Sequence, residues 1–163
     1  MNNVQQNTIV IDELLVRRLI ERQFPQWRNL TVRTVEYQGW DNRTFHLGNT
    51  MLVRLPSGAD YALQVTKEQY WLPKLAPLLP LCIAFPIVIG EPQDEYPWPW
   101  SIYRYLPGES ASIGYIADPC HFAKNLAKFL TALQKIDATN GPVAGLHSFY
   151  RGGPLAIYDA EVQ

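Results

Sequence analysis

The chain has 163 residues, of which 47% are hydrophobic and 18% are charged. This length suits one domain, or one domain with a small extension, and the apolar content excludes a disordered chain. The 14 basic and 15 acidic residues leave a net charge of −1. We therefore expect no nucleic-acid partner, because nucleic-acid-binding proteins carry a basic excess.

The cysteines and histidines give no framework for a disulfide or a metal site. Cys82 and Cys120 are isolated, and the histidines at 46, 121 and 147 contain no pair four residues apart. The N-terminus shows no signal peptide, and the apolar stretches are shorter than the ~20 residues that span a membrane. These features predict a cytoplasmic protein with no metal-ligand set of its own and no membrane-spanning helix.

The first third of the chain predicts one helix and three strands. Apolar residues at helical spacing indicate a helix over residues 12–22, with Asp12 as its N-cap. Three short strands with β-branched or alternating residues follow at 31–38, 43–47 and 50–55. Their tight connections, including residues 39–42, predict an antiparallel meander.

The rest of the chain predicts a helix, two strands and a second helix. The expected elements are a helix at 62–76, strands at 85–89 and 100–106, and a helix at 119–136. Pro73 is expected to kink or end the first helix, and Asp118 to cap the second. Residues 137–163 are expected to form loops with at most a short helix. The order predicts an α+β fold, in which a five-stranded antiparallel sheet has one helix inserted after its third strand.

Glu68 is the first residue that points to chemistry. It shares the apolar face of its helix with Val65, Leu72 and Leu75, where a lone carboxylate would be costly to bury. The nearest upstream cation in a strand is Arg54, at the end of the third strand. An arginine anchored by a carboxylate binds phosphate well, because its planar fork fits two oxygens. The alternative is a purely structural salt bridge.

Two further segments carry weaker signals. The hairpin GWDNRTFHLG, from Gly39 to Gly48, could lay backbone amides over a phosphate, or be an ordinary hairpin. The strand WSIYRYLPGE ends in Pro107-Gly108, and its free backbone groups could read the edge of a base. Its alternative is a strand that leads into a linker.

In this order, these segments resemble the aminoglycoside phosphotransferase family. The resemblance also rests on the strings MLVRLPSG, KEQYWLPKLAP, YPWPWSIYRYLPGES, FLTALQKIDA and LHSFYRGGPL, and it spans about residues 12–160. It implies the N-terminal lobe of a protein-kinase-like fold over residues 1–106. Residues 107–163 would then be a linker and the start of the C-terminal lobe.

The resemblance also implies a nucleotide site for ATP or GTP with magnesium. Asn42 and its neighbours would cover the phosphates, which Arg54 would touch while paired with Glu68. Arg104 and Leu106 would offer backbone groups to the purine, and Tyr103 would line the back of the pocket.

The sequence departs from the family in its catalytic residues. It contains no string of the type H-G-D-x-x-x-x-N and no following metal-binding aspartate, because His147 is followed by Ser-Phe. We therefore expect an N-terminal half with no catalytic residues, and little or no activity from this chain alone. The alternative is a non-catalytic nucleotide-binding or self-associating module, such as a homodimer through helix 119–136.

Overall fold

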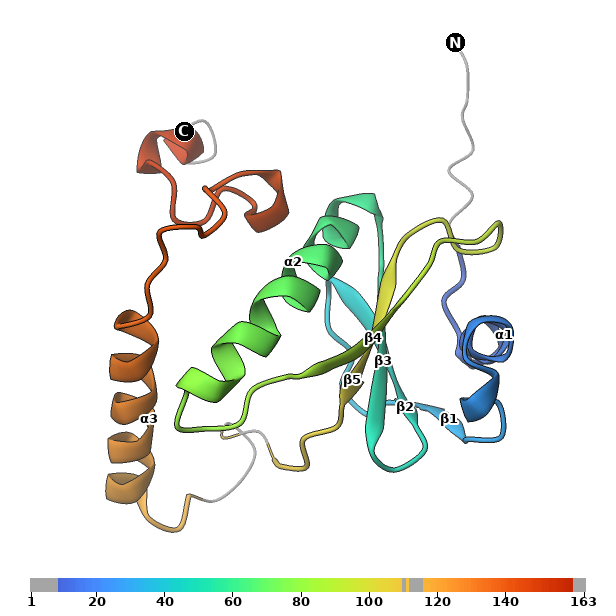
Figure 1. Ribbon diagram of the computed structural model, residues 1–163, viewed down its shortest axis with the longest axis horizontal. Coiled ribbons are helices and arrows are strands. Elements are labelled where there is room, and N and C mark those ends of the chain that lie inside the picture. The colour runs from blue at the N-terminus through green and yellow to red at the C-terminus, as the bar shows by residue number, and fades with distance from the viewer. Residues whose placement is uncertain (1–8, 110, 112–115, 160–163) are drawn as a thin grey trace.

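The computed structural model describes residues 9–109, 111 and 116–159 (Figure 1). Within these residues lie three α-helices and five β-strands, in the predicted order. The elements are α1 (Glu13–Gln23), β1 (Val32–Thr34), β2 (Asn42–Leu47), β3 (Met51–Pro56), α2 (Ala59–Leu75), β4 (Pro86–Gly90), β5 (Trp100–Arg104) and α3 (Pro119–Gln134). The five strands form one antiparallel sheet, which confirms the predicted α+β class.

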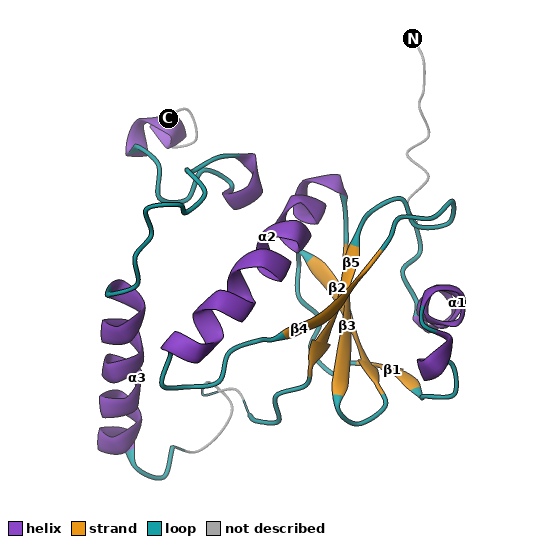
Figure 2. Ribbon diagram, in the orientation of Figure 1, coloured by secondary structure: helices purple, strands orange, loops and turns teal. Residues whose placement is uncertain are grey.

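The strands of the sheet follow the order β1-β2-β3-β5-β4. The first three are the predicted meander. β5 lies between β3 and β4, so the last two strands are exchanged relative to their order in the chain (Figure 2). The predicted strand 100–106 ends at Arg104, so Leu106 lies beyond the sheet and is 38% exposed.

The main core lies between α1 and one face of the sheet (Figure 1). Asp12 begins α1 as predicted, since its carboxylate accepts a hydrogen bond from the Leu15 N–H at 2.8 Å. The sheet contributes every second residue of its strands to this core, because successive side chains of a strand point to opposite faces. Its buried members include Leu15, Val16, Leu19, Ile20, Phe45, Leu47, Val53, Leu55, Trp100 and Ile102.

The first strand is shorter than predicted, because the Gln38 side chain bonds to the backbone of β2 where the strand was expected to continue. Its expected range was 31–38, but β1 ends at Thr34. The Gln38 side chain accepts from the Thr44 N–H and donates to the Thr44 carbonyl, both at 2.8 Å. Gln38 thus takes up the Thr44 N–H and shares the Thr44 carbonyl with the Val35 N–H, which donates to it at 3.4 Å, and residues 35–41 form a loop.

α2 lies on the opposite side of the sheet from α1, and α3 lies outside α2 (Figure 1). α2 begins at Ala59 rather than at residue 62, and it runs through Pro73 to end at Leu75. The helix thus ends one residue before the predicted end at residue 76, and Pro73 does not end it. Within the described part of the chain, no helix is both long enough and apolar enough to cross a membrane.

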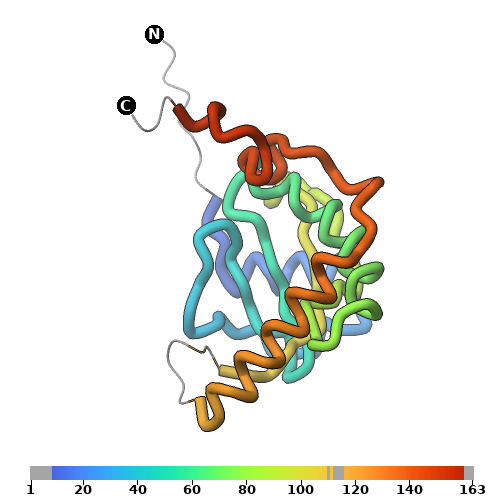
Figure 3. Tube along the Cα trace, turned by 90° about the vertical axis from the view of Figure 1, so that its left-hand side faces the viewer, coloured from blue at the N-terminus to red at the C-terminus, as the bar shows by residue number. Residues whose placement is uncertain are grey.

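The C-terminal segment follows α3 back towards α2 (Figure 3). Asp118 caps α3 by accepting from the His121 N–H at 2.9 Å, as predicted, but no residue of α3 is buried. Two short 3-10 turns, Leu146–Ser148 and Leu155–Tyr158, come next. The first of these packs against α2, where Lys67 donates to the His147 carbonyl at 3.2 Å.

Candidate functional site

Arg54 lies on the sheet face that is turned away from α1. Its neighbours in β3, Val53 and Leu55, are fully buried in the core with α1. Because successive strand residues point to opposite faces, the Arg54 side chain points to the α2 side. Thr44 of β2 and Ser101 of β5 are its Cα partners in the neighbouring strands.

Arg54 and Glu68 form the ion pair that the sequence predicts. Arg54 Nη1 donates to Glu68 Oε2 at 3.1 Å, and the two side chains are 30% and 23% exposed. This is the only hydrogen bond of the Arg54 guanidinium among the described residues. The remaining donors of the planar fork are therefore available to a ligand.

Tyr103 is a third member of this cluster. Its hydroxyl donates to Glu68 Oε2 at 2.5 Å, and its ring centroid lies 5.1 Å from Arg54 Cζ. Burial, followed by the negative charge of Glu68 and the hydrogen bond to it, raises the pKa of the Tyr103 hydroxyl above its ordinary value. The phenol therefore stays protonated and acts as a donor. The sequence placed Tyr103 near the site but did not predict this bond.

A second contact joins α2 to β5 next to the first. Gln69 Nε2 donates to Ser101 Oγ at 2.9 Å, and Ser101 is only 1% exposed. Glu68 and Gln69 follow each other in α2, and they are bonded to Tyr103 and Ser101, which are neighbours on the same face of β5. These contacts fix the position of the carboxylate that holds Arg54.

A row of larger side chains lies beside the cluster on the same face. His46, Leu52 and Tyr103 are Cα partners across β2, β3 and β5. The His46 ring meets the ring of Tyr105 edge to face, with centroids 5.0 Å apart. The face therefore carries an aromatic and apolar row next to the end of β5, and a row of Thr44, Arg54 and Ser101 beyond it. His46 and Tyr105 were not among the predicted site residues, because strand register cannot be read from a local sequence pattern.

Asn42 continues this face towards the loop. It begins β2 opposite Pro56, two residues from Thr44, so its side chain shares the Arg54 face. The loop of residues 35–41 directly precedes it. Along this face of β3, Leu52 with its neighbours His46 and Tyr103 is thus followed by Arg54, and then by the end of the strand beside Asn42 and the loop.

The segment after β5 offers fewer free backbone groups than expected. The Arg104 N–H donates to the Phe85 carbonyl at 2.9 Å, and the Tyr105 N–H donates to the Thr50 carbonyl at 2.8 Å. A ligand at this edge could therefore use the Arg104 carbonyl but not its N–H. The Arg104 side chain lies on the α1 side, where it lines a hollow of about 540 Å³ with Met51 and Ile87.

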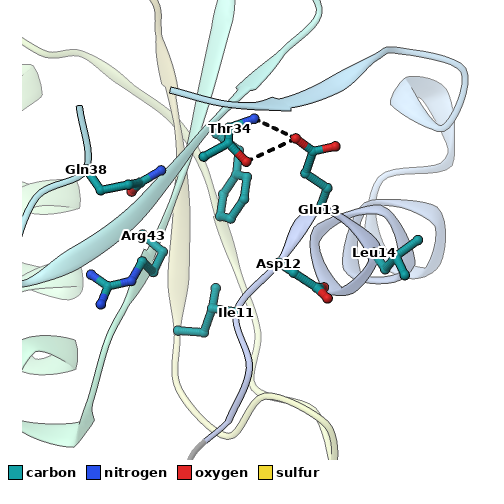
Figure 4. A pocket seen from close by; sticks show the side chains of 8 residues that line it. Ile11, Asp12, Glu13, Leu14, Thr34, Gln38 and Arg43 are labelled. Carbon is teal, nitrogen blue, oxygen red and sulfur yellow. Dashed lines mark hydrogen bonds between the residues drawn. The ribbon is translucent and has the colours of Figure 1, made fainter. Parts of the chain in front are cut away.

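A second hollow, of about 320 Å³, lies between the start of α1 and the strands β1 and β2 (Figure 4). Within it, Glu13 accepts from the Thr34 N–H at 2.8 Å and from the Thr34 hydroxyl at 3.0 Å. Both hydrogen bonds lower the pKa of Glu13, and the bond from the Thr34 N–H has the larger effect. Arg43 and Phe45 also line this hollow. It is on the α1 side and does not include Arg54.

The sequence matches the profile of the phosphotransferase enzyme family over residues 31–159. This match covers well over half of the chain, so the chain belongs to the phosphotransferase enzyme family. A search of curated proteins gives no match.

Solved structures of aminoglycoside phosphotransferases share the fold. The GDP complex of wild-type aminoglycoside 2'-phosphotransferase-IIIa has a TM-score of 0.71 at 20% identity, covering 93% of this chain and 49% of that one. The GDP and kanamycin complex of APH(2")-IIia has a TM-score of 0.68 at 22% identity, covering 77% and 43%. ADP-bound aminoglycoside phosphotransferase APH(2'')-Ib has a TM-score of 0.52 at 19% identity, covering 79% and 42%.

The chain spans less than half the length of these solved structures. Its fold is that of their N-terminal, protein-kinase-like lobe, as the sequence resemblance implied.

Proposed function

We propose that this chain is the nucleotide-binding half of a phosphotransferase that acts on a hydroxyl group of a small molecule, such as an aminoglycoside. The observation that carries the proposal is the Arg54 guanidinium. It is anchored by Glu68, which Tyr103 also holds, and its other donors are open to a ligand. A positioned guanidinium of this kind suits the oxygens of a nucleotide phosphate.

The rows on this face suggest how the nucleotide would lie. The base would rest on the row of His46, Leu52 and Tyr103, and the phosphates would extend along β3 towards Arg54. Asn42 and the loop before it would then cover the phosphates. Beyond β5, the Arg104 carbonyl and the backbone of Leu106 would meet the base edge. Residues 1–106 would form this nucleotide lobe, and residues 107–163 the linker and the start of a second lobe.

ATP and GTP both fit this proposal. The similar solved structures hold GDP, ADP or, in a ternary complex with streptomycin, ATP. Among the described residues, no group of three His, Cys, Asp or Glu side chains could hold a metal ion. Magnesium would then arrive bound to the nucleotide phosphates, without a metal-binding set from the described residues.

We expect this chain to bind nucleotide without transferring a phosphoryl group, because its sequence has no H-G-D-x-x-x-x-N string to orient the acceptor hydroxyl. Saturating Mg·ATP or Mg·GTP, at about 100 times Kd, should raise the midpoint of thermal unfolding by about 5–10 °C. An assay of ADP or GDP release with an aminoglycoside should stay at background. An unchanged midpoint would contradict the proposed binding, and steady turnover would contradict the proposed inactivity.

Self-association through α3 is the second candidate function. Phe122, Leu126, Leu130 and Leu133 share one side of this helix and are 39–45% exposed, and no residue of α3 is buried. An apolar helix face of this kind favours pairing with a second copy. Light scattering at micromolar concentration should then give the mass of a dimer, and Leu126→Lys should give a monomer. A monomeric mass for the unchanged chain would contradict this candidate.

A further inference from the structure

The last three carbonyl groups of the loop before β2, those of residues 39–41, accept hydrogen bonds from side-chain or backbone donors. Arg43 Nη1 donates to the Gly39 carbonyl at 3.0 Å. Ser57 Oγ lies 3.1 Å from both the Trp40 and the Asp41 carbonyl oxygens. The Ser57 N–H also donates to the Asp41 carbonyl, at 2.9 Å. Three successive carbonyls are thus held by two residues that lie outside the loop.

These bonds also fix the direction of the loop amides. A peptide unit is planar and trans, so the carbonyl of one residue and the N–H of the next point in opposite directions. Because Arg43 holds the Gly39 carbonyl, the Trp40 N–H points away from Arg43. Because Ser57 holds the Trp40 carbonyl, the Asp41 N–H points away from Ser57. Neither N–H donates a hydrogen bond to any described residue.

The position of the loop gives these free amides a use. Successive backbone N–H groups that point outward from a turn form an anion-binding concavity. The loop leads into Asn42 on the Arg54 face, and Ser57 lies three residues after Arg54 in the chain. Trp40 in this loop is 86% exposed.

We propose that Ser57, supported by Arg43, is a positioning residue for phosphate binding. Ser57 holds the carbonyls of Trp40 and Asp41, and Arg43 holds that of Gly39, which leaves the Trp40 and Asp41 N–H groups to donate to a nucleotide phosphate. The inference rests on the proposed nucleotide-binding function. It assigns Ser57 to the phosphates alone, because the row that would hold the base lies further along β3.

The test compares Ser57→Ala with Ser57→Thr in calorimetric titrations of the whole chain with Mg·ATP and with adenosine. Ser57→Ala removes the hydroxyl but keeps the backbone N–H bond to Asp41. Loss of its hydrogen bonds should weaken Mg·ATP binding about three- to tenfold. The affinity for adenosine should not change. Ser57→Thr restores a hydroxyl and should restore most of the Mg·ATP affinity.

The other outcomes separate this inference from the function on which it rests. If the unchanged chain binds Mg·ATP and Ser57→Ala binds it equally well, the role of Ser57 is overturned and nucleotide binding stands. If Ser57→Ala weakens adenosine and Mg·ATP equally, the hydroxyl acts on the fold in general and the inference is also overturned. If the unchanged chain binds neither ligand, the proposed function fails, and the inference fails with it.

Discussion

Replacing Arg54 with alanine is expected to weaken Mg·ATP and Mg·GTP binding by about ten- to 150-fold. Hydrogen bonds to a charged group contribute about 1.5–3 kcal/mol, which corresponds to this range. The substitution also leaves Glu68, which is only 23% exposed, without its cation and close to the proposed phosphate position. Its negative charge would then repel the ligand. Calorimetric titration of the variant against the unchanged chain measures both effects together.

Two matched variants show which part of Arg54 matters. Arg54→Lys keeps the charge but loses the planar fork, so it should bind nucleotide with intermediate affinity. Glu68→Gln keeps a hydrogen-bond acceptor for Tyr103 and Arg54 but removes the charge, and it should have a smaller effect than Arg54→Ala. If the pair is only a structural salt bridge, Arg54→Ala will lower the free energy of unfolding and leave nucleotide affinity unchanged. That result would remove the observation on which the proposed function rests.

The largest expected effect on stability is at Gly90, in the edge strand β4. A Cβ at this position would lie 2.0 Å from Trp100 Cε2, far inside van der Waals contact. Trp100 is fully buried and packs edge to face on Phe24, with ring centroids 5.6 Å apart, so the indole has little room to move. Gly90→Ala should therefore lower the free energy of unfolding by about 2–3 kcal/mol, as overpacked cores do.

Gly108→Ala is the matched control for this prediction. No atom lies within 4 Å of the Cβ position at Gly108, so its effect should stay within about 0.5 kcal/mol. Urea denaturation of both variants gives the comparison. Equal midpoints for Gly90→Ala and the unchanged chain would show that the contact between β4 and the core is looser than the structure indicates.

Local signals in the sequence were enough to predict most of the elements. Asp12 and Asp118 each precede an apolar stripe at helical spacing, and each caps its helix in the structure. The pairing of Arg54 with Glu68 was also predictable. A carboxylate on an apolar helix face requires a cation, and the strand before that helix offered one.

The features that were missed depend on contacts between distant parts of the chain. Gln38 ends β1 by bonding to the backbone of Thr44, an effect that strand propensity does not contain. The place of β5 beside β3 decides that Tyr103 reaches Glu68 and that His46 lies in line with Leu52. Without register, the sequence gives the residue types at these positions but not which of them meet.

The central claim, that this chain binds a nucleotide through the Arg54 face, is tested most directly by calorimetric titration of the unchanged chain. The titrants are Mg·ATP and Mg·GTP, and circular dichroism on the same sample establishes that the chain is folded. Saturable binding of one nucleotide per chain is expected for at least one of the two. A folded chain that shows no binding up to millimolar concentrations of either nucleotide would contradict it.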